Sequence, residues 1–138
     1  MTNYLIDTNV ISELRKARPH GAVTSWIEGL RDDQLYLSAV TIGEIQIGIE
    51  RTRRQDPQKA GEMDTWVDQL EKTVNILAMD SQCFREWARL MDGKSDDLLE
   101  DAMIAATARV HALTVATRNE KDFALLGVEL INPFQPAA

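Results

Sequence analysis

Four acidic residues stand at positions where a carboxylate is hard to justify on structural grounds alone. They are Asp7, Glu44, Asp101 and Asp122. Asp7 directly follows the apolar run 4–6, and Glu44 lies inside the apolar stretch 40–47. Asp101 shares a helical face with Leu98 and Ala105. Burying an ionised carboxylate costs several kcal/mol or more unless a cation or hydrogen bonds compensate, so acids that converge here suggest a hard metal ion.

Asp7 and Asp101 each have a simpler structural interpretation, which the sequence leaves open. Asp7 is placed to be the N-cap of the helix after the first strand, a role that is compatible with metal binding. Asp101 provides a favourable negative charge near a helix N-terminus. Asp97 and Glu100 fit a capping box, which favours a structural role for Asp97 over a catalytic one.

Glu44 and Asp122 have structural alternatives of a different kind. Glu44 and Arg51 are seven residues apart on one helical face, which permits a buried ion pair. Asn119 and Asp122 lie three residues apart after an apolar run, where they would simply cap a short helix. The sequence leaves each alternative open beside a role in a metal centre.

Short apolar segments alternate with amphipathic helical patterns along the chain. The expected strands are 3–6, 34–37, 74–77, 113–117 and 128–131. The expected helices are 8–17, one around 23–30, about 39–54, about 58–72, one that opens at Asp80 and one that follows Asp97. This alternation predicts an α/β fold with a mainly parallel five-stranded sheet and helices on both faces. Ligands bind such sheets at the carboxyl ends of the strands, where Asp7 and the segment 117–119 are expected.

Two of the helices carry signals about their ends and faces. Ser38 is the expected N-cap of the helix 39–54, although three isoleucines in that helix also alternate as they would in a strand. In the helix that opens at Asp80, the residues expected to face the core are Phe84, Trp87, Ala88 and Met91. These aromatic positions are therefore interpreted as structural.

The composition is that of one ordinary globular domain. The chain has 138 residues, of which 44% are hydrophobic, and contains no repeat or low-complexity tract. We therefore expect a single domain over residues 1–138. No run approaches the ~20 apolar residues of a membrane span and the N-terminus lacks signal-peptide features, so a cytoplasmic location is expected. The single cysteine, Cys83, excludes an internal disulfide and is expected to fill the core.

The net charge of −7 argues at first against a nucleic-acid partner, because phosphate binding relies on clustered lysine and arginine. The basic residues are nevertheless clustered. The groups are Arg15, Lys16 and Arg18; Arg51, Arg53 and Arg54; and Arg118 and Lys121. If the acids hold divalent cations, the cations invert the local field and the position of these bases matters more than the total charge. The first two groups are explained equally well as solvated helix ends.

Four short motifs follow one another along the chain. They are Asp7-Thr8-Asn9, Ser38-x-x-Thr41-x-x-Glu44, Asp101-Ala102-x-Ile104-Ala105-Ala106-Thr107-Ala108 and Thr117-x-Asn119-x-x-Asp122-Phe123. Any one of them is a weak signal, but four in this order and spacing are specific. Together with Asn132-Pro133-Phe134 they resemble the signature of PIN-domain ribonucleases, and more narrowly the VapC/FitB-type toxins of bacterial toxin–antitoxin modules. The resemblance covers nearly the whole chain and implies a PIN-like three-layer fold.

The resemblance also implies which residues form the metal centre. Asp7 and Asp101 would be the principal ligands of Mg²⁺ or Mn²⁺, ions that prefer oxygen ligands, with Glu44 as an additional ligand or water-positioning residue. Some relatives carry their last acid where Asn119 stands, but an amide replaces a negative charge poorly, so Asp122 is favoured for a second-metal or outer role. The hydrogen-bond partners of the acids would be Thr8, Asn9, Thr117 and Asn119.

The function that the resemblance implies is that of a metal-dependent endoribonuclease acting as a toxin. A small cognate antitoxin would hold it inactive, the toxin would be a homodimer, and the complex would bind operator DNA through the antitoxin. The weak candidates for RNA contact are Arg51, Arg53, Arg54, Arg118 and Lys121.

Other functional classes remain as alternatives. A haloacid-dehalogenase-type phosphatase also begins with a strand and an aspartate, but it needs a second acid two residues later, where this chain has Asn9. A phosphoacceptor receiver domain needs an acidic pair after the first strand, and that pair is missing. A catalytically degenerate PIN fold kept as an interaction module is the non-enzymatic alternative, and the intact acids argue against it.

Overall fold

The computed structural model describes residues 1–136, and the last two residues of the expected domain 1–138 lie outside the described part. The strands are β1 (Tyr4–Ile6), β2 (Leu35–Ser38), β3 (Asn75–Leu77), β4 (Thr114–Ala116) and β5 (Leu130–Ile131). The helices are α1 (Thr8–Glu13), α2 (Gly21–Glu28), α3 (Ala39–Arg53), α4 (Pro57–Thr73), α5 (Ser81–Met91), α6 (Leu99–His111) and α7 (Glu120–Ala124), with 3₁₀ turns at Asp32–Gln34 and Asp96–Leu98. All five expected strands are confirmed to within two residues at each end. No helix within residues 1–136 has the length and apolar character that crossing a membrane requires.

The five strands form one sheet in the order β3-β2-β1-β4-β5, and every neighbouring pair is parallel. All carboxyl ends therefore lie along one edge. Because β1 is the central strand and pairs with β4, the residues that follow these two strands are neighbours although they are far apart in the sequence. The backbone N–H of Asp7 still donates to the carbonyl of Ala116 at 2.9 Å, so the ladder holds Asp7 beside the end of β4.

Helices cover both faces of the sheet, because successive strand residues point in opposite directions. Ile6 packs in one core cluster with apolar residues of α1 to α4, while Leu5 packs in a second cluster with α6 and Phe123 of α7. All of these strand residues are almost fully buried. The predicted mainly parallel sheet with helices on both faces is confirmed, and the sheet is entirely parallel.

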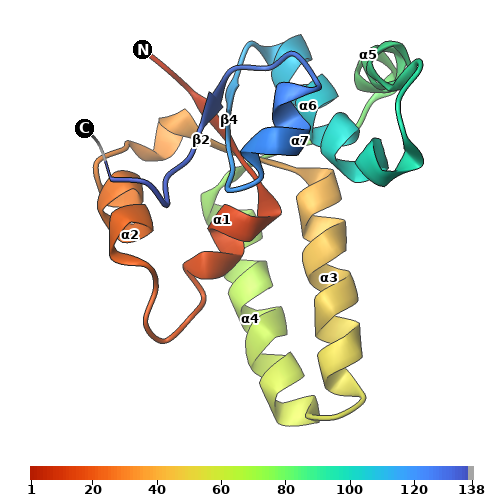
Figure 1. Ribbon diagram of the computed structural model, residues 1–138. Helices are drawn as coiled ribbons and strands as arrows, with labels where there is room; N and C mark the ends of the chain where they lie inside the picture. The colour runs from red at the N-terminus through yellow and green to blue at the C-terminus, as the bar shows by residue number, and fades with distance from the viewer. Residues whose placement is uncertain (137–138) are drawn as a thin grey trace.

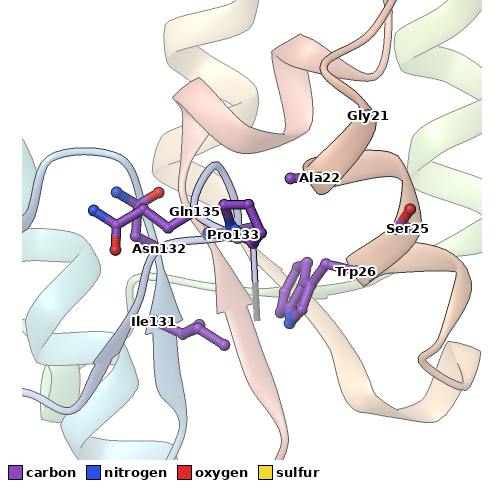
Figure 2. A pocket seen from close by; sticks show the side chains of 9 residues that line it. Gly21, Ala22, Ser25, Trp26, Ile131, Asn132, Pro133 and Gln135 are labelled. Atoms are coloured by element: carbon purple, nitrogen blue, oxygen red, sulfur yellow. The ribbon is translucent and has the colours of Figure 1, made fainter. Parts of the chain in front are cut away.

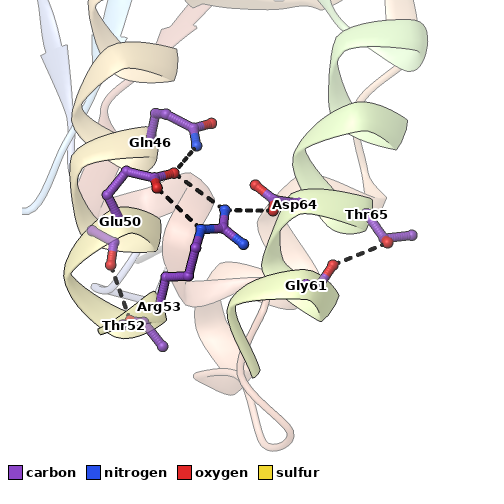
Figure 3. A network of polar contacts seen from close by, with 8 residues as sticks. Gln46, Glu50, Thr52, Arg53, Gly61, Asp64 and Thr65 are labelled. Carbon is purple, nitrogen blue, oxygen red and sulfur yellow. Dashed lines mark hydrogen bonds and ion pairs between the residues drawn. The ribbon is translucent and has the colours of Figure 1, made fainter. Parts of the chain in front are cut away.

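Helices α3 and α4 form a long antiparallel pair that extends away from the sheet (Figure 1). Ser38 is the N-cap of α3, as predicted, and its side chain accepts the N–H of Val40 at 3.0 Å. Near the far end of the pair, Arg53 of α3 lies between Glu50 and Asp64, with its Nη2 atom 2.6 Å from Asp64 Oδ2 (Figure 3). Arg53 thus joins the two helices through carboxylates of this chain.

The first helix is shorter than the predicted 8–17, because it ends at Glu13. The buried carboxylate of Glu13 accepts the Lys16 ammonium at 2.8 Å and the backbone N–H of His20 at 3.0 Å. These bonds hold the residues that follow Glu13 in a loop, so α1 does not continue into a further helical turn. This role of Glu13 cannot be read from the sequence, since a buried acid that accepts a hydrogen bond from a backbone N–H leaves no periodic signal.

Two predictions about the region of α5 and α6 were wrong. Phe84 and Ala88 are exposed rather than in the core, because α5 packs mainly on α6 and buries Cys83 on that side. Asp97 does not cap α6 either. Ser95 caps the preceding 3₁₀ turn by accepting the N–H of Asp97 at 3.2 Å, and α6 begins without a side-chain cap.

One backbone position allows the energetics of the fold to be tested. Ala112 ends α6 in the left-handed conformation, with φ 56° and ψ 48°, and its side chain is exposed. We predict that Ala112→Gly raises the free energy of unfolding by about 0.5–1 kcal/mol, because relief of left-handed strain outweighs the added freedom of the unfolded chain. Urea denaturation measures the change.

The matched control for this change is Ala88→Gly, at an exposed position inside α5. It should lower the free energy of unfolding by about 1 kcal/mol, because glycine is unfavourable in a helix interior. A loss of stability in both variants would contradict the assignment of strain to Ala112.

Candidate active site

Asp7 is the central acid of the site and emerges from the central strand. It is only 4% exposed, yet each of its carboxylate oxygens is hydrogen-bonded. Oδ1 accepts the N–H of Thr8 at 2.8 Å, and Oδ2 accepts the Thr117 hydroxyl at 2.7 Å and the Asn9 amide at 3.1 Å. Burial raises the pKa of Asp7 above its ordinary value, while these hydrogen bonds act in the opposite direction. Asp7 is the N-cap of α1, as the structural alternative proposed, but capping does not account for the bonds from Thr117 and Asn9.

Glu44 lies one turn into α3, at the end of the helix that meets the sheet. Its Oε1 atom accepts the Thr8 hydroxyl at 3.0 Å, and that hydroxyl lies 3.2 Å from the hydroxyl of Thr41. No lysine or arginine among the described residues forms an ion pair with Glu44, so the predicted alternative of a pair with Arg51 is wrong. Burial raises the pKa of Glu44 to about 7, and the neighbouring carboxylates of Glu100 and Asp7 add to the rise.

Asp101 and Asp122 are joined by the side chain of Asn119. The Asn119 amide donates to Asp101 Oδ2 at 2.9 Å and to Asp122 Oδ2 at 3.0 Å. Burial raises the pKa of Asp101 to about 6, helped by the charges of Asp7 and Asp122. Asn119 stands at the N-cap position of α7 without making a side-chain cap bond, and Asp122 lies inside the helix. The alternative in which this pair only caps a helix is therefore wrong.

The tertiary structure thus brings four separate segments to one edge of the sheet, the end of β1, the start of α3, the start of α6 and the segment that follows β4. The negative charge of Asp7 raises the pKa of both Glu44 and Asp101, so Asp7 is close enough to interact with each of them. Glu100 belongs to the same group, because it raises the pKa of both Glu44 and Asp101. From the sequence, Glu100 was assigned only to a capping box with Asp97, although its position directly before Asp101 could have pointed to the site.

The donor set of this edge fits a hard divalent cation. All of the acids offer oxygen, and none of the four predicted acids is neutralised by a lysine or arginine ion pair in the described part of the chain. Within residues 1–136 no three acidic, histidine or cysteine side chains already have the arrangement that holds a metal ion. Burial is the main cause of the raised pKa values of Asp7, Glu44 and Asp101, and neighbouring carboxylates add to the rise for Glu44 and Asp101. A bound cation would stabilise the charged form of all three acids.

The basic residues predicted to contact RNA differ in how far their side chains already interact with other groups of the protein. Arg118 follows Thr117, its backbone N–H donates to Asn9 Oδ1 at 3.2 Å, and its guanidinium lies 4.1 Å from the centre of the Phe134 ring. Arg51 and Arg54 are exposed on α3 and line a shallow groove of about 540 Å³. Arg53 is instead paired with Glu50 and Asp64 (Figure 3), and Lys121 is exposed on α7. The role of these side chains in RNA contact stays a prediction.

A larger cavity of about 640 Å³ lies between α2 and the C-terminal segment, with Trp26 on one side and Pro133 on the other (Figure 2). None of the four acids lines this cavity. The acidic edge is therefore separate from this cavity.

Comparisons with known proteins agree with this arrangement. The PIN domain family model matches residues 4–128. The chain is 38% identical to VapC ribonuclease Y4jK of Sinorhizobium fredii, over 96% of this chain and 99% of that protein. It is 31% identical to toxin FitB of Neisseria gonorrhoeae, over 94% of this chain and 97% of that protein.

A solved structure supports the same assignment. One chain of the structure of FitAB bound to an IR36 DNA fragment superimposes with a TM-score of 0.85 at 30% identity, covering 98% of each chain. Both the sequence match and the fold match extend over nearly all of the chain. This protein therefore belongs to the PIN domain family.

Proposed function

We propose that this protein is a divalent-metal-dependent endoribonuclease and the toxin of a toxin–antitoxin module. The observation that carries the proposal is the convergence of un-neutralised carboxylates at the carboxyl edge of the sheet, around the buried Asp7. Relatives named as a VapC ribonuclease and as toxin FitB support the reaction class and the biological role. The whole chain 1–138 would act as one domain.

The residues that would hold Mg²⁺ or Mn²⁺ are Asp7, Asp101 and Glu44, with Asp122 in a supporting position. When bound, such a cation supplies Lewis-acid stabilisation for the charge that develops on a phosphodiester and acidifies water for attack. Thr117 and Asn9 orient Asp7 through its Oδ2 atom, and Thr8 orients Glu44. These neutral donors fix the direction of each carboxylate without cancelling the charge that attracts the cation.

The partners follow from the same assignment. The matched structure is a FitAB complex bound to DNA, and this supports a cognate antitoxin that inhibits the toxin and carries the complex to operator DNA. We further propose that the toxin is a homodimer in the complex. RNA is the substrate, and the open acidic edge gives a strand access to the carboxylates.

The first test is RNA cleavage by variants that remove one charge without changing shape. Asp7→Asn and Asp101→Asn should each reduce cleavage of single-stranded RNA in Mg²⁺ by roughly 10³-fold or more, because each change removes a charged oxygen that stabilises the transition state. Circular dichroism and thermal unfolding should show that both variants stay folded. Wild-type activity should disappear in EDTA and return with Mg²⁺ or Mn²⁺.

The control for this test is Asp68→Asn, which changes an exposed acid of α4 that has no salt-bridge partner within residues 1–136. It should cleave at the wild-type rate. Full cleavage by Asp7→Asn or Asp101→Asn in Mg²⁺ would refute the assignment of these acids to the active site. A folded wild type that cleaves no RNA in Mg²⁺ or Mn²⁺ would instead leave the protein as a degenerate interaction module.

The raised pKa values predict how the stability of the metal-free protein depends on pH. The folded state binds protons on Glu44 and Asp101 more tightly than the unfolded chain does, with pKa values of about 7 and about 6. Their contribution to stability is complete below the ordinary carboxylate pKa and is lost as pH rises through about 6 to 7. The unfolding midpoint in EDTA should therefore fall between about pH 5 and pH 8.

Two comparisons isolate the cause of the fall in the unfolding midpoint with pH. Glu44→Gln and Asp101→Asn should each make the midpoint depend less on pH, and saturating Mn²⁺ should restore the midpoint at high pH. Glu86 and Glu50 have lowered pKa values, so their opposite effect appears only in more acidic solution. A midpoint that rises with pH in EDTA would show that the pKa values of Glu44 and Asp101 are not raised in the folded protein.

The basic residues of α3 allow a test of where RNA lies. Arg51→Ala combined with Arg54→Ala should weaken binding of single-stranded RNA and reduce the salt dependence of log K by about 0.7 for each lost phosphate contact. Fluorescence anisotropy in the inactive Asp101→Asn background measures both quantities without cleavage.

Arg53→Ala is the matched comparison on the same helix. Because Arg53 is paired with Glu50 and Asp64, this change should leave the salt slope unaltered. It should lower the free energy of unfolding by no more than about 1 kcal/mol, since both pairs are partly exposed. An unchanged salt slope in the Arg51/Arg54 variant would place the RNA on another surface.

A further inference from the structure

Asn119 occupies a position whose usual structural role it does not perform. It is the N-cap residue of α7, and asparagine is among the best N-cap residues, yet its side chain makes no cap hydrogen bond. The amide is turned instead toward the acidic edge, where Nδ2 donates at 2.9 Å to Asp101 and at 3.0 Å to Asp122. One neutral group thus bridges two carboxylates that carry like charge.

The position of this amide is tied to Asp7 through the backbone. The N–H of Asn119 donates to the Thr117 hydroxyl oxygen at 2.9 Å, and that hydroxyl donates to Asp7 Oδ2 at 2.7 Å. Phe123, three residues after the start of α7, is fully buried and anchors the helix in the core. The hydrogen bonds through Thr117 on one side and the buried Phe123 on the other therefore fix the position of Asn119 relative to Asp7.

The bridge leaves one oxygen of each carboxylate free. Both hydrogen bonds use the Oδ2 atoms, and in the described structure no hydrogen bond engages Oδ1 of Asp101 or Asp122. Asparagine offers two N–H groups on one nitrogen and adds no charge, whereas lysine or arginine here would neutralise the acids and compete with a cation. The amide opposes the repulsion between the acids and preserves their attraction for a cation.

We propose that Asn119 is a positioning residue that sets the divalent-cation affinity of the site by holding Asp101 and Asp122 together in the metal-free protein. The inference rests on the proposed function, because it assigns Asp101 to the cation. It gives Asn119 a role distinct from helix capping and from that of an acidic ligand at the same position.

Calorimetric titration of the metal-free protein with Mn²⁺ tests the proposal directly. Asn119→Ala should weaken Mn²⁺ binding by about 10- to 100-fold, the usual effect of losing a group that orients a metal ligand. Asn119→Asp should bind Mn²⁺ at least as tightly as the wild type. In EDTA above neutral pH the same aspartate should lower the unfolding midpoint, because it adds a third charge beside the other two.

A capping role makes the opposite prediction for these variants. Aspartate caps a helix about as well as asparagine, so Asn119→Asp would then have wild-type stability in EDTA, and Asn119→Ala would lose stability without losing Mn²⁺ affinity. Asn132→Ala is the control, since Asn132 also donates to a carboxylate, that of Glu120, outside the acidic edge. Its Mn²⁺ affinity should equal that of the wild type.

The outcomes separate this inference from the proposed function. Tight Mn²⁺ binding by the wild type and equally tight binding by Asn119→Ala would overturn the role of Asn119 and leave the metal centre intact. A wild-type protein that binds no Mn²⁺ and cleaves RNA in EDTA would overturn both proposals.

Discussion

The repulsion between carboxylates at the carboxyl edge of the sheet is the constraint on which the rest of the site depends. Asp7, Glu44 and Asp101 have raised pKa values because they are partly or almost fully withdrawn from water, and neighbouring acids add to the rise for Glu44 and Asp101. Among the described residues 1–136, the groups that donate hydrogen bonds to these three acids are all neutral, namely hydroxyls, amides and one backbone N–H. An arrangement that fixes the direction of negative charges without cancelling them keeps a strong attraction for a cation, at a cost in stability to the metal-free protein.

The sheet order makes this arrangement possible. Because β1 lies between β2 and β4 with all strands parallel, Asp7 and Thr117 emerge side by side, and the helix after β2 begins at the same edge with Glu44 one turn inside it. The buried residues on the two sheet faces fix the register of these strands, since a shift by one residue would turn Leu5 and Ile6 to the wrong cores. The core therefore supports the site by preventing such a shift.

The basic residues of this acidic chain fall into two groups, those that form ion pairs within the protein and those that remain exposed. Arg53 and Arg109 each form ion pairs with carboxylates of this chain, and Arg109 also donates to the carbonyl of Gly127 at 2.7 Å. Arg51 and Arg54 remain exposed along the helix that carries Glu44. A net charge of −7 is thus compatible with a polyanionic substrate, because a phosphate would respond to the local field of a bound cation and of exposed arginines rather than to the total charge.

The sequence by itself determined the alternation of strands and helices, the buried run before Asp7 and the N-cap at Ser38, because local hydrophobic period and capping chemistry specify such features. It also indicated which acids belong together, through four motifs in order. Only the tertiary structure decided how Asn119 bridges Asp101 and Asp122, why Glu44 has no arginine partner, that Glu100 joins the acids, and that α1 ends at Glu13. Most of these features depend on contacts between segments far apart in the chain. The end of α1 depends on hydrogen bonds between the Glu13 carboxylate and the loop that follows it. Side-chain periodicity carries no information about either kind of contact.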